Sequence, residues 1–346
     1  MAPLAWTMLT TSLSTSTIIT MSSYHWLLAW AGLELNTLSI LPLLSNPQHP
    51  RATEATMKYF IVQTAAATMI LFAGTMNTWQ TGNWTITQTM TNTTSTMMIM
   101  ALMMKLGLTP LHFWYPDVVQ GTTFINAMII STWQKIAPLT LLCLIPTNSQ
   151  TNMLLLMGTT SALVGGLMGL NQTQTRKMLA FSSIAHMGWL TITITLNQHL
   201  TTLTMMTYMA MTITMFYSLH TTKAKTLTDI GTNYHYSPTL LITITMTLMS
   251  MGGLPPMTGF MPKWLTLTEM LKLDLTTMST MLVLTTLPSL FFYIRISYLS
   301  ALTMPPNTTN SNHKWRLNTN LPTMTMPTIA VATLLLPITP LLYPTL

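Results

Sequence analysis

The stretch Met97–Trp114, with the sequence MMIMALMMKLGLTPLHFW, carries the strongest fold signal in the chain. This Met-rich apolar run contains Lys105, is interrupted by Gly107 and Pro110, and has His112 just beyond the interruption. A charge at bilayer depth costs from about 3 kcal/mol to more than 10 kcal/mol, so such a residue is a functional-site hypothesis. Gly and Pro free backbone groups, which is tolerated only inside protein or beside a water-filled cavity. The stretch therefore predicts a buried functional lysine on a broken transmembrane helix.

The composition of the whole chain is that of an integral membrane protein. Only 5% of the 346 residues are charged, 49% are hydrophobic and the mean hydropathy is +0.45, whereas soluble domains carry roughly 25% charged residues. The net charge of +7 comes from Lys and Arg scattered singly or in pairs. We therefore interpret them as topology determinants and expect no nucleic-acid partner.

The sequence shows no constellation that would hold a cofactor. Cys143 is the single cysteine, and one thiolate cannot hold an iron–sulfur cluster or a structural zinc. Neither a Walker motif nor a dinucleotide glycine motif is present. We expect this chain to bind no metal and no cofactor. The N-terminal stretch has no basic n-region, which argues against a cleaved signal or transit peptide.

Hydropathy predicts an all-α polytopic membrane protein with about eleven spans of ~20 residues. The Thr-rich run TITITL (191–196) alternates like a strand, but threonine can hydrogen-bond back onto its own helix, so we predict a helix there. The expected spans are 2–21, 25–45, 57–76, 95–114 (broken), 123–145, 151–170, 177–196, 200–222, 238–264 (broken), 276–299 and 323–343.

The basic residues segregate to one side of this arrangement. Nine of the 13 Lys and Arg fall on the side of the N-terminus, and one, Lys272, falls in the opposite loops. The positive-inside rule therefore predicts that the N-terminus faces the positive compartment and the C-terminus the other. The nine are Arg51, Lys58, Arg176, Lys177, Lys223, Lys225, Arg295, Lys314 and Arg316.

Two spans carry a similar interruption. Gly107-x-x-Pro110 is matched by Gly252-x-x-Pro255, and an aromatic residue follows each. The two breaks are five spans apart, so they predict two repeats in opposite orientation, the architecture of secondary transporters. A chance match of the two motifs is the open alternative. The repeats would cover 1–146 and 147–300, with a loop and a final helix in 301–346.

Four charged residues lie within the predicted spans. Glu34, Lys105 and Lys135 are near the middle of theirs, so extension of the lysines to the membrane surface is disfavoured. A desolvated lysine can exchange a proton near neutral pH, and a nearby carboxylate would hold that proton in place. Glu34 could thus act as a switch on Lys105. Lys263 is closer to a membrane edge, where an interfacial anchor is the alternative to a proton site.

Other polar residues near the breaks have two interpretations each. His186, in FSSIAHMGWL, and His112 could relay protons, because imidazole titrates near neutral pH, or could be satisfied core histidines. Asp117, after the first break, is either part of a site or a loop-side cap or surface pair.

Several longer motifs carry a resemblance to a known family. Together they resemble the subunit 2 family of mitochondrial NADH dehydrogenase, which belongs to the antiporter-like membrane subunits of respiratory complex I. The resemblance spans about residues 24–264, and the C-terminal spans agree in pattern more than in motif. The motifs are HWLLAWAGLELNTLSILPLL (25–44), PRATEATMKYF (50–60), MKLGLTPLHFWYPDVVQG (104–121), TWQKIAPL (132–139), NQTQTRKMLAFSSIAHMGW (171–189) and MGGLPPMTGF (251–260).

The resemblance implies a fold, a function and a set of site residues. It implies two inverted five-helix repeats plus a final helix, and proton translocation across the mitochondrial inner membrane, coupled to electron transfer from NADH to ubiquinone. Glu34 matches the family's acidic partner, Lys105 the lysine of the first broken helix, Lys135 the connecting lysine and Lys263 the lysine of the second broken helix. His112 and His186 are possible relays with a weaker match.

The resemblance also implies a setting for the chain. NADH, FMN, iron–sulfur clusters and ubiquinone would be bound by other subunits. The partners would be neighbouring antiporter-like and other membrane-arm subunits, accessory subunits and phospholipids. The N-terminus would face the matrix and the C-terminus the intermembrane space. The residues alone leave two alternatives open: a stand-alone cation/proton antiporter, and a structural scaffold of the membrane arm.

Overall fold

The computed structural model describes residues 3–88, 90–145, 150–232, 238–301 and 325–339. In these ranges the chain is helical, and the only β-type pairings are two isolated bridges, His25 with Thr85 and Gln174 with Thr226. The chain divides into two compact units, Met1–Gly158 and Thr159–Leu346. The repeat boundaries expected from the sequence stay a prediction.

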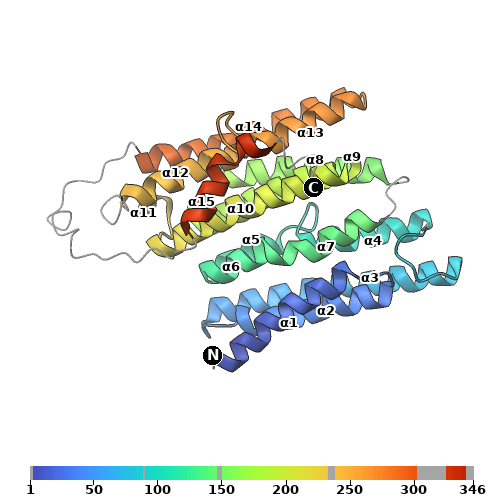
Figure 1. Cartoon of the computed structure of the whole chain (residues 1–346). Coiled ribbons are helices and arrows are strands. Elements are labelled where there is room, and N and C mark those ends of the chain that lie inside the picture. Colours follow the sequence, from blue (N-terminus) through green and yellow to red (C-terminus); the bar gives the residue numbers. More distant parts are fainter. Residues whose placement is uncertain (1–2, 89, 146–149, 233–237, 302–324, 340–346) are drawn as a thin grey trace. The chain divides into compact units, whose positions relative to one another are not determined.

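The first unit is a bundle built around α2, α3 and α4. Helix α2 packs between α1 and α3, while α4 contacts α3 and α7, and α5 lies on α3 (Figure 1). Helices α6 and α7 are separated only by Thr132 and together form one apolar span. The helices are α1 (Pro3–Met21), α2 (Trp26–Leu44), α3 (Pro50–Thr81), α4 (Asn92–Leu106), α5 (Trp114–Gly121), α6 (Phe124–Ser131) and α7 (Trp133–Leu144).

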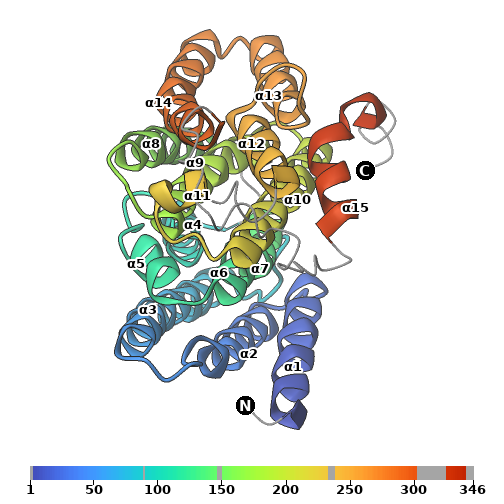
Figure 2. The same cartoon turned by 90° about the vertical axis from the view of Figure 1, so that its left-hand side faces the viewer.

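The second unit is organised around α10. Helix α10 contacts α9, α12, α13 and α15, and α12 in turn packs on α14 (Figure 2). Helix α8 begins in the first unit and continues into the second. The elements are α8 (Thr151–Gly169), α9 (Thr175–Leu196), α10 (Gln198–Thr222), α11 (Leu227–Thr232), α12 (Pro238–Gly252), α13 (Phe260–Lys272), α14 (Thr276–Ala301), α15 (Thr325–Leu334) and the short 3-10 helix η3 (Leu336–Ile338).

Threonine-rich segments form helices by bonding onto themselves. In α9 the hydroxyls of Thr191, Thr193 and Thr195 each donate to the backbone carbonyl three residues earlier, at 2.7–2.9 Å. The hydroxyls thereby find partners without water, as a membrane setting requires. The helix predicted for TITITL is confirmed.

Six described helices are long and apolar enough to cross a membrane: 26–44, 50–81, 124–144, 151–169, 175–196 and 276–300. The two broken spans escape this criterion because each is divided into two short helices, α4 with α5 and α12 with α13. Their second halves run on to Gly121 and Lys272, beyond the predicted limits of 114 and 264. The predicted last span, 323–343, lies partly outside the described residues. The number eleven stays a prediction.

Both breaks have the same backbone geometry. The helix α4 ends at Gly107 (φ 73), where Leu108 N donates to Met103 O at 3.0 Å and Gly107 N to Met104 O at 3.2 Å. The helix α12 ends at Gly253 (φ 81), where Leu254 N and Gly253 N make the same two bonds to Met249 O and Ser250 O. This is the Schellman ending, which favours glycine because its φ is positive.

The breaks therefore correspond with an offset of 146 residues. Gly253 follows Gly107 by that number, and so do the start of α13 after the start of α5 and the end of α12 after the end of α4. Pro110 then corresponds to Pro256. The pairing of Gly107 with Gly252 made from the sequence was wrong by one residue, because the second glycine of the Gly252–Gly253 pair takes the left-handed conformation.

Candidate functional site

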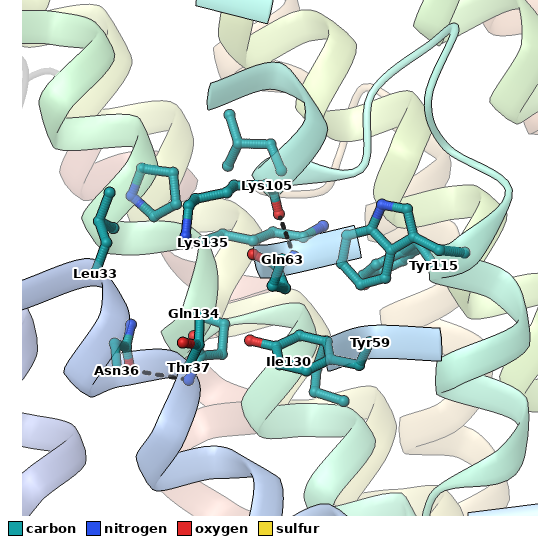
Figure 3. A pocket seen from close by; sticks show the side chains of 13 residues that line it. Leu33, Asn36, Thr37, Tyr59, Gln63, Lys105, Tyr115, Ile130, Gln134 and Lys135 are labelled. Carbon is teal, nitrogen blue, oxygen red and sulfur yellow. Dashed lines mark hydrogen bonds between the residues drawn. The ribbon is translucent and has the colours of Figure 1, made fainter. Parts of the chain in front are cut away.

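Lys105 and Lys135 line one cavity in the first unit, between α4 and α7 (Figure 3). Their exposed fractions are 6% and 3%. The volume open to the centre of a water-sized sphere is ≈ 10 Å³, close to the minimum that holds one water molecule. The rest of the lining mixes polar and apolar groups: Leu33, Asn36, Thr37, Tyr59, Gln63, Leu106, Trp114, Tyr115, Ile130, Gln134 and Pro138.

The two lysines have different surroundings. Lys135 Nζ lies 4.7 Å from the centroid of the Tyr115 ring, a cation–π geometry. Lys105 Nζ is buried and finds no hydrogen-bond partner among the described residues. A buried ammonium without a partner is costly, and a water in the cavity could supply one. The cavity thus holds one cation on an aromatic face and one without a direct partner.

The end of α4 helps Lys105 to carry its charge. Lys105 lies in the last turn of α4, where the helix dipole favours a cation. Trp114 Nε1 donates to Met104 O at 3.2 Å, and Gln63 Nε2 donates to the Lys105 carbonyl at 3.4 Å. These side chains satisfy carbonyls freed by the break, so the lysine ammonium does not have to.

Glu34 acts on Lys105 through space. Its Oε2 accepts a hydrogen bond of 3.1 Å from the Thr37 hydroxyl on the same helix. Glu34 is within electrostatic range of Lys105 and of Tyr59, but among the described residues no ion pair joins Glu34 to either lysine of the cavity. A Glu34–Lys105 influence in this structure is therefore long-range and not a salt bridge.

Lys263 and His186 line a second cavity, in the second unit. The volume open to the centre of a water-sized sphere is ≈ 30 Å³ there, enough for water. Lys263 Nζ donates to Gly252 O at 2.9 Å, so it reaches back from α13 to the end of α12, where a cation is favoured. This geometry favours a role at the break over an interfacial anchor. Other lining residues are Trp189, Leu190, Thr204, Thr207, Tyr208, Met211, Gly259, Pro262 and Thr266.

His186 sits among tyrosines. Its Nε2 lies 3.4 Å from the Tyr293 hydroxyl, and its ring centroid is 5.8 Å from that of Tyr208. The association of His186 with Lys263 was not foreseen from the sequence. No spacing signal could have found it, because the two residues come from helices α9 and α13.

His112 lies outside the lining of the Lys105–Lys135 cavity. It is buried, with Nδ1 3.3 Å from Pro110 O and its ring 4.3 Å from that of Phe113. These contacts stay within the loop between α4 and α5, so a relay role for His112 stays a prediction. In the described residues, no group of three or more His, Cys, Asp and Glu side chains could hold a metal ion.

The fold and the two cavities define a class of membrane protein. Two broken helices of matching register, each with a buried lysine at the break, form an antiporter-type transporter architecture. The family model described as "NADH:quinone oxidoreductase/Mrp antiporter, TM" matches residues 23–289. A second model, "NADH dehydrogenase subunit 2 C-terminus", matches residues 290–343.

Curated relatives make the family specific. NADH-ubiquinone oxidoreductase chain 2 of Gallus gallus is 48% identical over 342 residues, 99% of each chain. The protein of the same name from Carassius auratus is 49% identical over 341 residues, 98% of each chain. The chain belongs to the family of NADH-ubiquinone oxidoreductase chain 2. The family resemblance inferred from the sequence is confirmed.

Solved structures support the fold. A chain of "Respiratory complex I from Thermus thermophilus with bound Aureothin" is similar with a TM-score of 0.86 and 22% identity, covering 99% of this chain and 80% of that chain. A chain of the Mrp complex from Dietzia sp. DQ12-45-1b has a TM-score of 0.80 and 14% identity, covering 97% and 75%. The predicted all-α antiporter-like fold is confirmed.

Proposed function

We propose that this chain is the subunit that moves protons through its part of the membrane arm of NADH:ubiquinone oxidoreductase, in the mitochondrial inner membrane. The N-terminus faces the matrix and the C-terminus the intermembrane space. NADH, FMN, iron–sulfur clusters and ubiquinone are bound by other subunits, and this chain contacts neighbouring membrane-arm and accessory subunits and phospholipids. The observation that carries the proposal is the burial of Lys105 and Lys135 in one cavity.

The two lysines hold the proton with unequal strength. Tyr115 stabilises the charged form of Lys135 by its ring, whereas Lys105 depends on the distant charge of Glu34 and on the end of α4. Neutralising Glu34 or moving it away from Lys105 would weaken the hold on the Lys105 proton. A water in the cavity would then carry the proton from Lys105 to Lys135.

Lys263 and His186 form a second station. His186 can accept and donate a proton near neutral pH, and it shares a cavity with the ammonium of Lys263. Moving one charge against 100 mV costs about 2.3 kcal/mol, which electrostatic changes of this size can supply. The energy comes from the reaction of NADH with ubiquinone in the other subunits.

Substitution of Lys105 tests the proposal in the assembled complex. In membrane vesicles, we expect Lys105→Ala to lower the rate of NADH-driven proton pumping at least about tenfold, since it removes a proton-carrying group. Lys272→Ala is the control, because Lys272 is exposed and paired with Glu269 at 2.7 Å. A Lys105→Ala complex that assembles and pumps at the normal rate would favour the scaffold alternative.

The fold similarity to a chain of an Mrp complex favours one further candidate, a stand-alone cation/proton antiporter. The two functions differ when the purified chain is reconstituted alone into liposomes. An antiporter would exchange protons for Na⁺ or K⁺ across the vesicle membrane. A subunit that depends on the rest of the complex would leave an imposed cation gradient uncoupled from the internal pH.

A further inference from the structure

The second halves of the two broken helices begin with the same pattern. Helix α5 starts Trp114-Tyr115-Pro116-Asp117, and helix α13 starts Phe260-Met261-Pro262-Lys263. Both read aromatic, any residue, proline, charge. By the offset of 146 residues, Asp117 occupies the position that carries the site lysine of the second unit. The first unit therefore has a charged residue at the equivalent place, of opposite sign.

Asp117 is tied to helix α3 by an ion pair. Its carboxylate lies 2.9 Å from Lys58 Nζ, and Lys58 is also 2.8 Å from Glu54 on its own helix. The Lys58 and Asp117 side chains are 42% and 45% exposed, and exposed pairs of this kind contribute only about 0–1 kcal/mol to stability. The surface pair expected for Asp117 is present. It adds little stability, so its consequence has to be sought in where it holds α5.

Helix α5 has a second close contact with α3. A Cβ at Gly121 would lie 2.7 Å from Ala55 Cβ and 2.8 Å from Arg51 O, so the two backbones touch at the last residue of α5. Arg51, Glu54, Lys58, Asp117 and Gln120 surround a polar pocket at this junction. The eight-residue helix is thus fastened to α3 along the side of its Asp117 and Gly121.

The start of the same short helix enters the lysine cavity. Trp114 and Tyr115 both line it, and the Tyr115 ring faces Lys135 Nζ. Tyr115 is two residues from Asp117 on a rigid helix, so a shift of Asp117 on α3 moves the ring relative to Lys135. Misplacement of about 1 Å is enough to change the rate of a positioned reaction strongly.

We propose that the Lys58–Asp117 ion pair is a positioning element that holds half-helix α5 on α3 and thereby keeps the Tyr115 ring on Lys135. Lys58 and Asp117 are positioning residues and do not carry the transported proton themselves. This inference rests on the proposed function, in which Lys135 exchanges a proton within the cavity.

The test breaks and restores the pair in the assembled complex. We expect Asp117→Asn and Lys58→Gln each to slow proton pumping about fivefold and to shift its pH profile, while artificial-acceptor NADH oxidation is unchanged. The charge-reversed double variant Lys58→Asp with Asp117→Lys should recover most of the pumping rate. Glu54→Gln is the matched control, because it removes the other partner of Lys58 and leaves the Lys58–Asp117 pair intact.

The outcomes separate this inference from the proposed function. Normal pumping and a normal pH profile in Asp117→Asn would overturn the inference, as would a charge-reversed variant no better than the single variants. If Asp117→Asn does not assemble, Asp117→Glu and Lys58→Arg keep the charges and change only the geometry; wild-type behaviour of both at every pH would also overturn it. Lys105→Ala is measured alongside: normal pumping there refutes the proposed function itself.

Discussion

At the scale of single residues, the intramembrane lysines were identifiable from sequence and their partners were not. The cost of a charge at bilayer depth pointed to Lys105 and Lys135. The Tyr115 ring at 4.7 Å from Lys135 depends on how α5 packs, and the sequence alone does not specify that packing. The missing Glu34–Lys105 ion pair has the same origin, since the reach of a side chain between helices is set by tertiary packing.

The Tyr115 ring provides a residue-scale prediction. Tyr115→Phe keeps an aromatic face under Lys135, so pumping should stay within about twofold of the wild-type rate. Tyr115→Leu removes the ring and about 1–2 kcal/mol of stabilisation of the buried cation, and pumping should fall by about five- to thirtyfold. The rate is measured in vesicles of the assembled complex. Equal rates in the Phe and Leu variants would show that the ring does not matter.

At the scale of elements, the sequence located both breaks but misaligned one. The Gly252–Gly253 pair offers two candidates for the left-handed position, and only the hydrogen bonds of Leu254 and Gly253 distinguish them. The glycine at the break also meets a functional side chain, because a Cβ at Gly253 would lie 2.9 Å from Lys263 Nζ. The backbone ending and the lysine therefore share one space.

Alanine at two left-handed glycines separates these effects. Gly82 (φ 74) has open space around it, so Gly82→Ala should cost only the backbone strain, about 1–2 kcal/mol. Gly253→Ala should cost more and should also displace Lys263 and slow pumping. Hydrogen exchange at the amides of Gly82 and Leu254, which close their helix ends, measures the local cost. A Gly253→Ala variant that matches Gly82→Ala in cost and pumps normally would contradict the shared space.

The start of α11 gives a prediction about pH. Burial would raise the pKa of Asp229, but hydrogen bonds from the Thr226 amide and hydroxyl and the Lys225 amide outweigh it and hold that pKa below its usual value. Because the folded-state pKa is lowered, the stabilisation is complete above the unfolded pKa of about 3.9 and is lost as the pH falls through the folded value.

Hydrogen exchange at Lys225 and Thr226 checks this sign. After correction for intrinsic rates, protection should be constant between about pH 5 and 7 and should fall only below about pH 4. Asp229→Ala should lower protection about fivefold at neutral pH, the usual cost of losing a capping side chain. Asp229→Asn keeps an acceptor without the charge, so its smaller loss should not vary with pH. Protection that falls between pH 7 and 5 would contradict the assignment.

At the scale of the whole molecule, backbone and charge follow different rules. The offset of 146 residues relates the two breaks, yet Met251 stands at the position of Lys105, and Asp117 stands at that of Lys263. Hydropathy and the G-x-x-P motifs predicted the repeated breaks because backbone geometry repeats. The charges were found only one by one, because each unit places its lysine on a different half of its broken helix.

This asymmetry leads to a prediction for the pair Lys105 and Lys263. If the two lysines are successive stations of one proton path, either alanine substitution interrupts the path, and the double variant should pump no more slowly than the slower single variant. If each unit conducts protons independently, the two losses should add to give a much slower double variant. Pumping rates of the four assembled complexes distinguish the cases, and Lys105→Ala combined with Lys272→Ala controls for removing a second positive charge. We expect the non-additive result, because a path that alternates lysines between the half-helices has no second copy of either station.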